Sequence, residues 1–364
     1  MKIAIILGTR PEIIKMSPII RELDKRGLDY FILHTGQHYD YEMDGKLFKD
    51  LELARPKYNL KTGSSEYRKQ IGLMIRKIYQ LLKKESPDYV IVQGDTNTVL
   101  AGALAANKLG IKICHHEAGL RSHDLTMLEE TNRIITDHIS DLLFAPTEDA
   151  MKNLVDENLG GKDKTFLTGN TIVDALFDNA ELARKKGKML KELKIKKGGY
   201  ILVTAHRAEN VDDSKRLGGI LEGLKLIGSH LKIPVIFPMH PRTANSVKKF
   251  GLKIPFGVRV IKPLGYLDFL QLESSAKLII TDSGGLQEEA CILKIPCVTV
   301  RDNTERPETI MAGVNVLAGT DPERIFDCCR SILKKKKKWS NPYGDGRAGK
   351  RIIDIFISRH EKIT

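Results

Sequence analysis

The segment 281–290, TDSGGLQEEA, places a serine and two glycines between a short apolar run and a predicted helix. Glycines at a helix start leave the first backbone N–H groups open to a ligand. Those groups and the helix dipole together favour a phosphate. We therefore expect Ser283, Gly284 and Gly285 to bind a diphosphate, with Glu289 one or two turns further on facing a ribose. The alternative is that Ser283 only caps the helix.

Polar residues also follow four of the predicted strands. They are Arg10 and Glu12 after 2–7, Asp95 after 89–93, Glu117 after 111–115, and His206 after 200–204. Ligands of open α/β sheets bind outside the carboxyl ends of the strands. Two doubly wound domains that face each other would bring these ends to one interdomain cleft.

Each of these residues has an alternative, structural role. Asp95 fits the N-cap of the helix that follows it, and His206 fits a turn. Glu117 is able to pair with the arginine four residues on. Glu129 completes a capping box with Thr126. Because four independent strand ends each carry a charged or titratable side chain, we favour a shared site over four separate coincidences.

The elements that position these residues follow a simple rhythm. Short β-branched runs alternate with longer helical segments, which predicts parallel strands joined by helical crossovers. Strands are expected at 2–7, 30–34, 89–93, 111–115, 142–145, 165–167, 200–204, 235–238, 258–261, 277–281 and 297–300. Helices are expected at 13–26, 66–84 and 98–109.

A chain of 364 residues exceeds the usual size of a single hydrophobic core, so we expect two domains. This alternation of predicted strands and helices is interrupted by a stretch rich in lysine and glycine. We predict a Rossmann-like N-terminal domain over 1–183, a linker over 184–199, and a second Rossmann-like domain over 200–345. A last helical segment over 346–364 is able to pack on either domain.

The net charge of +13 is unevenly distributed, because the segment 331–364 holds ten Lys or Arg against three Asp or Glu. The lysines at 334–338 close a predicted helix that begins near Asp321, where cations suit the C-terminal dipole. The sequence has no aromatic stripe, zinc-finger spacing or helix-turn-helix pattern. We therefore expect no nucleic-acid partner.

Composition also bears on compartment and cofactors. Five cysteines without CxxC spacing indicate reduced core thiols rather than zinc, which predicts a cytoplasmic protein without a metal. The apolar run at 3–7 is too short for a signal peptide or a membrane span. A GxGxxG match at 344–349 follows no strand, and Arg351 replaces the hydroxyl residue that a P-loop needs. We therefore expect neither NAD nor ATP.

Eight segments form a more specific pattern. They follow one another over nearly the whole chain, at 8–15, 94–96, 117–121, 129–133, 169–174, 281–289, 301–308 and 341–346. Together they resemble the non-hydrolysing UDP-N-acetylglucosamine 2-epimerases. The resemblance implies a GT-B architecture, a homodimer, and a C-terminal helix packed back on the first domain. It also implies reversible conversion of UDP-N-acetylglucosamine to UDP-N-acetylmannosamine, by elimination of UDP to 2-acetamidoglucal and re-addition, without metal or cofactor.

The resemblance further implies roles for individual residues. Asp95, Glu117 and Glu129 would be the acid and base carboxylates, and His206 would contact the leaving diphosphate. The substrate would be bound by Arg10, Lys15, Asp95, Glu117, Arg133, His206, Leu264, Phe269, Ser283, Gly284, Gly285, Glu289 and Arg306. An activating UDP-N-acetylglucosamine would be bound by Gln37, His38, Gln70 and His240.

Three alternatives stay open. A GT-B glycosyltransferase would share the UDP site but transfer the sugar to an acceptor, a hydrolysing epimerase would release free N-acetylmannosamine, and a related 2-epimerase would act on a modified UDP-N-acetylhexosamine. Three candidate carboxylates favour epimerisation over transfer. Family members commonly carry a proline before the Glu-Glu pair, whereas Leu128 stands there in this chain. The choice between Glu129 and Glu130 therefore depends on the geometry of this loop.

Overall fold

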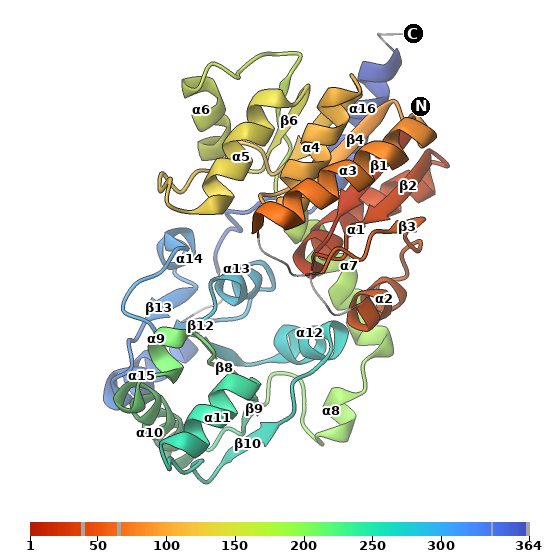
Figure 1. Cartoon of the computed structure of the whole chain (residues 1–364). Coiled ribbons are helices and arrows are strands. Elements are labelled where there is room, and N and C mark those ends of the chain that lie inside the picture. Colours follow the sequence, from red (N-terminus) through yellow and green to blue (C-terminus); the bar gives the residue numbers. More distant parts are fainter. Residues whose placement is uncertain (38–40, 64–66, 336–337, 362–364) are drawn as a thin grey trace. The chain divides into compact units, whose positions relative to one another are not determined.

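The computed structural model describes residues 1–37, 41–63, 67–335 and 338–361. The chain divides into two compact units (Figure 1). Unit 1 comprises Met1–Ala175 and Tyr343–Thr364, and unit 2 comprises Leu176–Pro342.

Unit 1 contains a parallel sheet of seven strands in the order β3-β2-β1-β4-β5-β6-β7. The strands are β1 (Lys2–Leu7), β2 (Asp29–His34), β3 (Tyr58–Asn59), β4 (Tyr89–Gln93), β5 (Lys112–His116), β6 (Leu142–Ala145) and β7 (Thr165–Leu167). Its helices are α1 (Arg10–Lys25), α2 (Tyr41–Asp50), α3 (Tyr67–Glu85), α4 (Asn97–Lys108), α5 (Leu128–Ile139), α6 (Glu148–Asp156) and α16 (Ala348–Glu361). All five residues of β4 are buried, as expected for a strand covered by helices on both faces.

Unit 2 contains a parallel sheet of six strands in the order β10-β9-β8-β11-β12-β13. The strands are β8 (Ile201–Thr204), β9 (Val235–Pro238), β10 (Val258–Ile261), β11 (Leu278–Thr281), β12 (Cys297–Thr299) and β13 (Asn315–Leu317). Its helices are α8 (Met189–Glu192), α9 (Ala208–Val211), α10 (Ser214–Leu231), α11 (Pro241–Lys249), α12 (Tyr266–Ser275), α13 (Gly284–Ile292), α14 (Pro307–Met311) and α15 (Pro322–Lys334). Two apolar clusters, one on each side of this sheet, form its core.

The two units divide within a single helix, α7 (Thr171–Lys186), between Ala175 and Leu176. The sequence placed the boundary later, at 184–199, because lysine and glycine accumulate there. The helical pattern simply continues up to Lys186, so composition marks the end of α7 rather than the division between the units.

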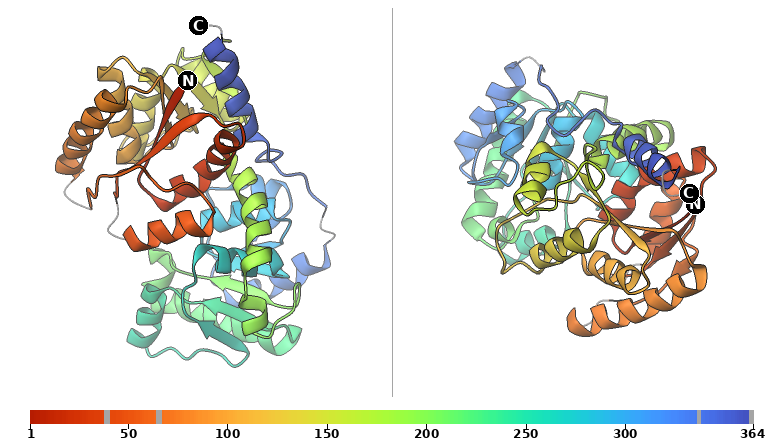
Figure 2. Two further views of the ribbon diagram at one scale, coloured as in Figure 1. Left: turned by 90° about the vertical axis from the view of Figure 1, so that its right-hand side faces the viewer. Right: turned by 90° about the horizontal axis from the view of Figure 1, so that it is seen from above.

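The C-terminal helix α16 belongs to unit 1 and packs against α1 (Figures 1 and 2). A Cβ added at Gly349 would lie only 3.0 Å from Pro18, so the two helices approach closely at a glycine. Asp174 accepts hydrogen bonds from the first backbone N–H groups of α16. Phe356 packs its ring against Tyr89 and Phe144 at centroid distances of 5.4 and 5.6 Å.

Two doubly wound parallel sheets were predicted, and this fold class is confirmed. Every strand expected from the sequence is present, with bounds shifted by at most one residue. The strands missing from the prediction are β3 and β13, which lie at sheet edges and have two and three residues. A strand of two residues such as β3 forms no recognisable apolar run. Within the described residues, no helix has the length and apolar character needed to cross a membrane.

Candidate active site

Glu117 and Lys15 form the central ion pair of unit 1. Glu117 follows β5, is 4% exposed, and places its carboxylate oxygens 2.7 and 2.9 Å from Lys15 Nζ of α1. Gln93, at the end of β4, donates a further hydrogen bond to Glu117. Burial raises the pKa of Glu117, but Lys15, the imidazole of His116 and these hydrogen bonds outweigh burial. The pKa therefore lies below its usual value, and Glu117 is ionised at neutral pH.

The backbone at Glu117 has φ of 67°, in the left-handed region that non-glycine residues seldom adopt. A buried carboxylate, Asp137 of α5, holds the turn in this conformation. It lies 2.6 Å from Nδ1 of His115, accepts a hydrogen bond from the Gly119 backbone N–H, and pairs with Arg121 at 2.7 Å. Burial raises the pKa of Asp137, yet His115 and Arg121 lower it more, so the group stays ionised. Arg121 is thus engaged here rather than with Glu117.

Asp95 follows β4 and forms an ion pair with Arg133 of α5. The helix after it, α4, takes Thr96 as its N-cap, so Asp95 has no capping role. Asp95 and Glu117 follow neighbouring strands, and a Cβ added at Gly94 would lie 3.8 Å from Oε2 of Glu117. The structure therefore brings Asp95, Arg133, Glu117 and Lys15 to one edge of the sheet.

The two adjacent glutamates of α5 differ in burial and in hydrogen bonding. Glu130 is 1% exposed, and its carboxylate accepts hydrogen bonds from the backbone of Ser122 and His123 and pairs with Arg133. Glu129 is exposed and has no hydrogen bond or ion pair to any described residue. The expected capping box does not form, because α5 begins at Leu128 with Met127 as its N-cap. Glu130 thus holds the loop, while Glu129 remains available to a ligand.

Glu12 completes a capping box with Thr9 at the start of α1. Its carboxylate also accepts a hydrogen bond of 2.5 Å from the Thr96 hydroxyl, and it accepts hydrogen bonds from backbone N–H groups of the β1–α1 turn. Burial raises the pKa of Glu12 to about 7, against the lowering effect of these hydrogen bonds. This side chain ties the turn that carries Arg10 to the turn that carries Asp95.

In unit 2, His206 and Asp282 form the corresponding pair. His206 follows β8 and places Nδ1 3.2 Å from Asp282, which follows the neighbouring strand β11 and is fully buried. The backbone N–H groups of His206 and Arg207 both donate to the same carboxylate. Burial raises the pKa of Asp282, but His206 and these backbone donors bring it below its usual value. An ionised Asp282 therefore orients the imidazole and leaves Nε2 for a ligand.

The start of α13 follows Asp282 directly. Ser283 is the N-cap residue by backbone conformation, but its side chain makes no capping hydrogen bond. Its own N–H is held by the Thr281 hydroxyl at 2.9 Å. A Cβ added at Gly284 would meet nothing closer than 3.6 Å, and one at Gly285 nothing closer than 3.9 Å. There is therefore space beside both glycines at the start of α13, where an anion-binding helix presents its first amides.

The remaining predicted substrate residues of unit 2 lie on elements around α13. Phe269 is on α12, and Leu264 shortly precedes that helix; both pack partly buried against the apolar cluster beneath them. Glu289 is half-buried on α13. Arg306 is the N-cap residue of α14 and lies 3.4 Å from Glu288 of α13.

The residues expected to bind an activator lie in both units. Gln37 accepts hydrogen bonds from the N–H and hydroxyl of Thr98, and its backbone carbonyl accepts one from Gln70. His240 is exposed in unit 2, with its ring 6.0 Å from that of His206. His38 lies outside the described residues.

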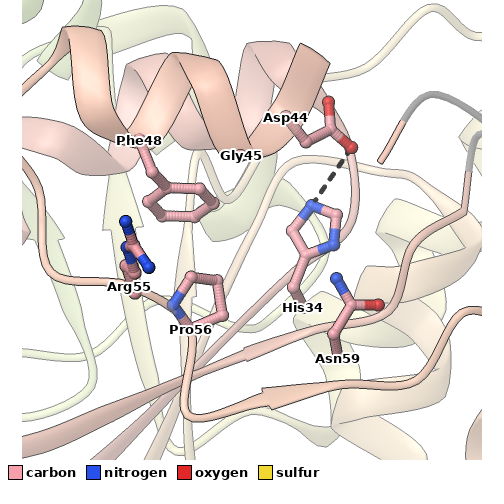
Figure 3. Close-up of a pocket in the computed structure, with 7 residues that line it drawn as sticks. All are labelled: His34, Asp44, Gly45, Phe48, Arg55, Pro56 and Asn59. Atoms are coloured by element: carbon pink, nitrogen blue, oxygen red, sulfur yellow. Dashed lines mark ion pairs between the residues drawn. The ribbon is translucent and has the colours of Figure 1, made fainter. Parts of the chain in front are cut away.

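A cavity of about 270 Å³ in unit 1 is lined by His34, Asp44, Gly45, Phe48, Arg55, Pro56 and Asn59 (Figure 3). Burial lowers the pKa of His34 to about 4, so its imidazole is neutral at neutral pH. The Gly36 N–H donates to Nδ1, which leaves the proton on Nε2, 3.6 Å from Asp44. Asp44 also lies 3.7 Å from Arg10, so this cavity adjoins the candidate site.

Comparisons with known proteins identify the family of this chain. The UDP-N-acetylglucosamine 2-epimerase family model matches residues 21–357. The UDP-N-acetylglucosamine 2-epimerase of Methanococcus maripaludis is 53% identical over 362 residues, which is 98% of each chain. This chain belongs to the UDP-N-acetylglucosamine 2-epimerase family.

Two further relatives of this epimerase family add detail. The crystal structure of the Methanocaldococcus jannaschii UDP-GlcNAc 2-epimerase in complex with UDP-GlcNAc and UDP is 51% identical to this chain, with a TM-score of 0.81. The match covers 98% of this chain and all of that one. The UDP-2,3-diacetamido-2,3-dideoxy-D-glucuronate 2-epimerase of Pseudomonas aeruginosa is 41% identical over 98% of this chain and 99% of its own length. The predicted GT-B class is confirmed by the two sheets together with solved structures of the family.

Some residues that hold the candidate site residues within each unit were not predicted from the sequence. Asp137 and Asp282 are both fully buried, and Gln93 contacts Glu117 directly. Asp282 stood inside the recognised segment 281–290, but only the fold shows that it faces His206. The signal for Asp137 is a charged residue on the buried side of α5, a helix whose range was not predicted. Within the described part of the chain, no group of three or more metal-ligating side chains occurs.

Replacing Asp137 by Asn should destabilise unit 1, because Arg121 and His115 would lose a buried anionic partner. Breaking such a buried pair costs about 3 kcal/mol or more. Because the folded pKa of Asp137 is depressed, its stabilisation is present above the usual aspartate value and is lost as pH falls through the folded pKa. The difference in melting temperature between wild type and D137N should therefore be large at pH 7 and shrink in acid. D327N, which alters an exposed pair, is the control. Equal melting of D137N and wild type at pH 7 would contradict this role.

Proposed function

We propose that this protein interconverts UDP-N-acetylglucosamine and UDP-N-acetylmannosamine without hydrolysis. UDP is eliminated across C1–C2 to give 2-acetamidoglucal and is then added back with the opposite configuration at C2. The observation that carries the proposal is the pair of carboxylates Asp95 and Glu117 on neighbouring strand ends, each held by a cation. The relative from Methanocaldococcus jannaschii, which binds UDP-GlcNAc and UDP, supports it.

The chemistry demands these residue types. A proton must leave C2 on one face of the sugar and another must be delivered on the opposite face, which requires carboxyl groups able to exchange roles. We assign this work to Asp95, Glu117 and Glu129. Arg10, Lys15 and Arg133 would bind the sugar-nucleotide beside them and supply positive charge.

The leaving group needs a different environment. UDP departs with negative charge on its diphosphate, and preorganised N–H donors stabilise such charge as it develops. Gly284 and Gly285 supply backbone amides at the start of α13, and we assign Ser283, His206 and Arg306 to the same diphosphate. Glu289 would accept the ribose hydroxyls, and Phe269 with the Leu264 backbone would flank the uracil. No step in this scheme calls for a metal or a redox cofactor.

The same C2 chemistry on a modified UDP-N-acetylhexosamine is the second candidate. The Pseudomonas aeruginosa relative, named for a diacetamido-dideoxy-glucuronate substrate, favours it. Activation through Gln37, His38, Gln70 and His240, the homodimer and the cytoplasmic location all stay predictions.

Proton and phosphorus NMR of the purified protein with UDP-N-acetylglucosamine tests the proposal. We expect a second N-acetylhexosamine spin system whose anomeric phosphate is retained. Free N-acetylmannosamine with UDP would instead indicate hydrolysis. An unchanged spectrum that alters only when a sugar acceptor is added would indicate a transferase.

Replacing Gly284 by Ala tests the diphosphate site. The added methyl has room in the folded protein, but it would stand between the first amides of α13 and a phosphate. We expect wild-type melting and at least about tenfold weaker UDP binding by calorimetry, or about 1.4 kcal/mol. Gly218→Ala, another helical glycine with room for a methyl, is the matched control and should bind UDP normally. Unchanged UDP affinity in G284A would remove the start of α13 from the site.

Glu129 and Glu130 offer a matched pair of substitutions. Glu129→Gln should lower turnover by roughly 10²-fold or more, because an available acid or base is lost, and should leave melting unchanged. Glu130→Gln should mainly lower the melting temperature, because Ser122, His123 and Arg133 lose an ionised partner. A larger kinetic loss in E130Q than in E129Q would show that the acid-base role belongs to Glu130.

A further inference from the structure

Unit 2 contains a buried carboxyl group that the proposed mechanism does not use. Glu273 of α12 is only 1% exposed, and its neighbours on that helix, Leu272 and Ala276, belong to an apolar cluster. Its side chain is hydrogen-bonded to Glu289 of α13. Its other oxygen, Oε1, has no hydrogen-bond partner among the described residues.

Two carboxyl groups in contact at a buried site cannot both be ionised, so one proton is shared between them. Burial raises the pKa of Glu273 well above its usual value, and the charge of Glu289 together with the hydrogen bond raises it further. Glu289 is only half-buried, so the negative charge resides there, closer to solvent. Glu273 is the neutral acid and donates its proton to the hydrogen bond.

The other titratable groups near Glu273 do not compete for this role. Burial raises the pKa of Cys297 of β12 to about 12, so it is a neutral thiol. Burial also raises the pKa of Tyr200, and its hydroxyl donates to the Leu272 carbonyl. Only Glu289 faces Glu273 as an anion among the described residues.

The position of this pair relates it to the nucleotide site. Glu273 lies four residues after Phe269 on α12, so the two side chains share one face of that helix. Glu289 lies five residues beyond Gly284 on α13, about 7.5 Å along the helix axis from the amides assigned to the diphosphate. Glu289 therefore contacts the buried acid and lies on the same helix as the amides assigned to the diphosphate.

We propose that Glu273 is a positioning residue whose hydrogen bond holds the Glu289 carboxylate toward the 2′ and 3′ hydroxyls of the bound ribose. This rests on the proposed function, in which α13 binds the diphosphate of UDP. Glu273 thereby helps the site to prefer ribonucleotides over nucleotides that lack these hydroxyls. A side chain without a donor at position 273 would leave Glu289 free to turn away.

Calorimetry with UDP and 2′,3′-dideoxy-UDP on the full-length wild type, E273Q and E273L tests this. Wild type should bind UDP more tightly than the dideoxy compound. E273Q retains a neutral donor and should keep this preference, whereas E273L should lose most of it, roughly tenfold, through weaker UDP binding alone. The wild-type preference should also decline at alkaline pH, as Glu273 ionises and repels Glu289, while that of E273Q should not.

The calorimetry distinguishes failure of the proposed function from failure of the role proposed for Glu273. If wild type binds neither nucleotide, the proposed function fails. If wild type binds both equally while forming the epimer, the function stands and the ribose role of Glu289, with Glu273 behind it, is wrong. A full preference in E273L would overturn the proposal. Should E273L not fold, identical pH profiles for wild type and E273Q would overturn it equally.

Discussion

The candidate site of unit 1 depends on one buried carboxylate, Asp137. It accepts the Gly119 N–H and engages His115 and Arg121, and these contacts fix the turn that follows β5. Within that turn Glu117 adopts a left-handed backbone conformation, which costs on the order of 1–3 kcal/mol unless the surroundings enforce it. Strain of this kind concentrates at functional sites. Here it directs a carboxylate toward Lys15 instead of along the strand.

In unit 2, Asp282 likewise fixes the turn that follows a strand. This fully buried carboxylate lies at the end of β11 and accepts backbone N–H groups from the turn after the neighbouring strand β8. It therefore couples the imidazole of His206 to the start of α13. In both units an ionised, buried aspartate fixes a turn, and that turn carries a side chain proposed to act on a ligand: Glu117 in unit 1 and His206 in unit 2. The aspartates are structural, and the residues they hold do the proposed chemistry.

Much of the candidate site was predictable from the sequence. Short β-branched runs alternate with longer helical segments in a parallel α/β fold, and this alternation marks where each strand ends. Asp95, Glu117 and His206 were singled out for following predicted strands, and all three do follow strands in the structure. What the sequence could not provide was choice among partners. From the sequence, Glu117 could pair with Arg121, which is four residues away, or with Lys15, which is about a hundred residues away. Only the fold shows that Lys15 of α1 lies beside β5.

The same reasoning explains the other differences. The predicted linker at 184–199 differs from the division between Ala175 and Leu176 because composition reports solvent exposure rather than contacts between elements. The box expected between Thr126 and Glu129 is absent because Asp124 accepts the hydrogen bonds of Thr126, and the helix begins later. Burial separates Glu129 from Glu130, and burial depends on which face of α5 meets the sheet. The sequence alone cannot distinguish these two neighbouring glutamates, because it does not show which of them is buried.

The central claim is that carboxylates of unit 1 remove and replace the proton at C2 during elimination and re-addition. Between these steps the carboxyl groups can exchange with solvent, so the returned hydrogen comes from water. Mass spectrometry of the UDP-N-acetylmannosamine formed early in a reaction run in deuterated water tests this directly. The account predicts one deuterium at C2 in the product. Epimerised product that carries no deuterium at C2 would contradict it.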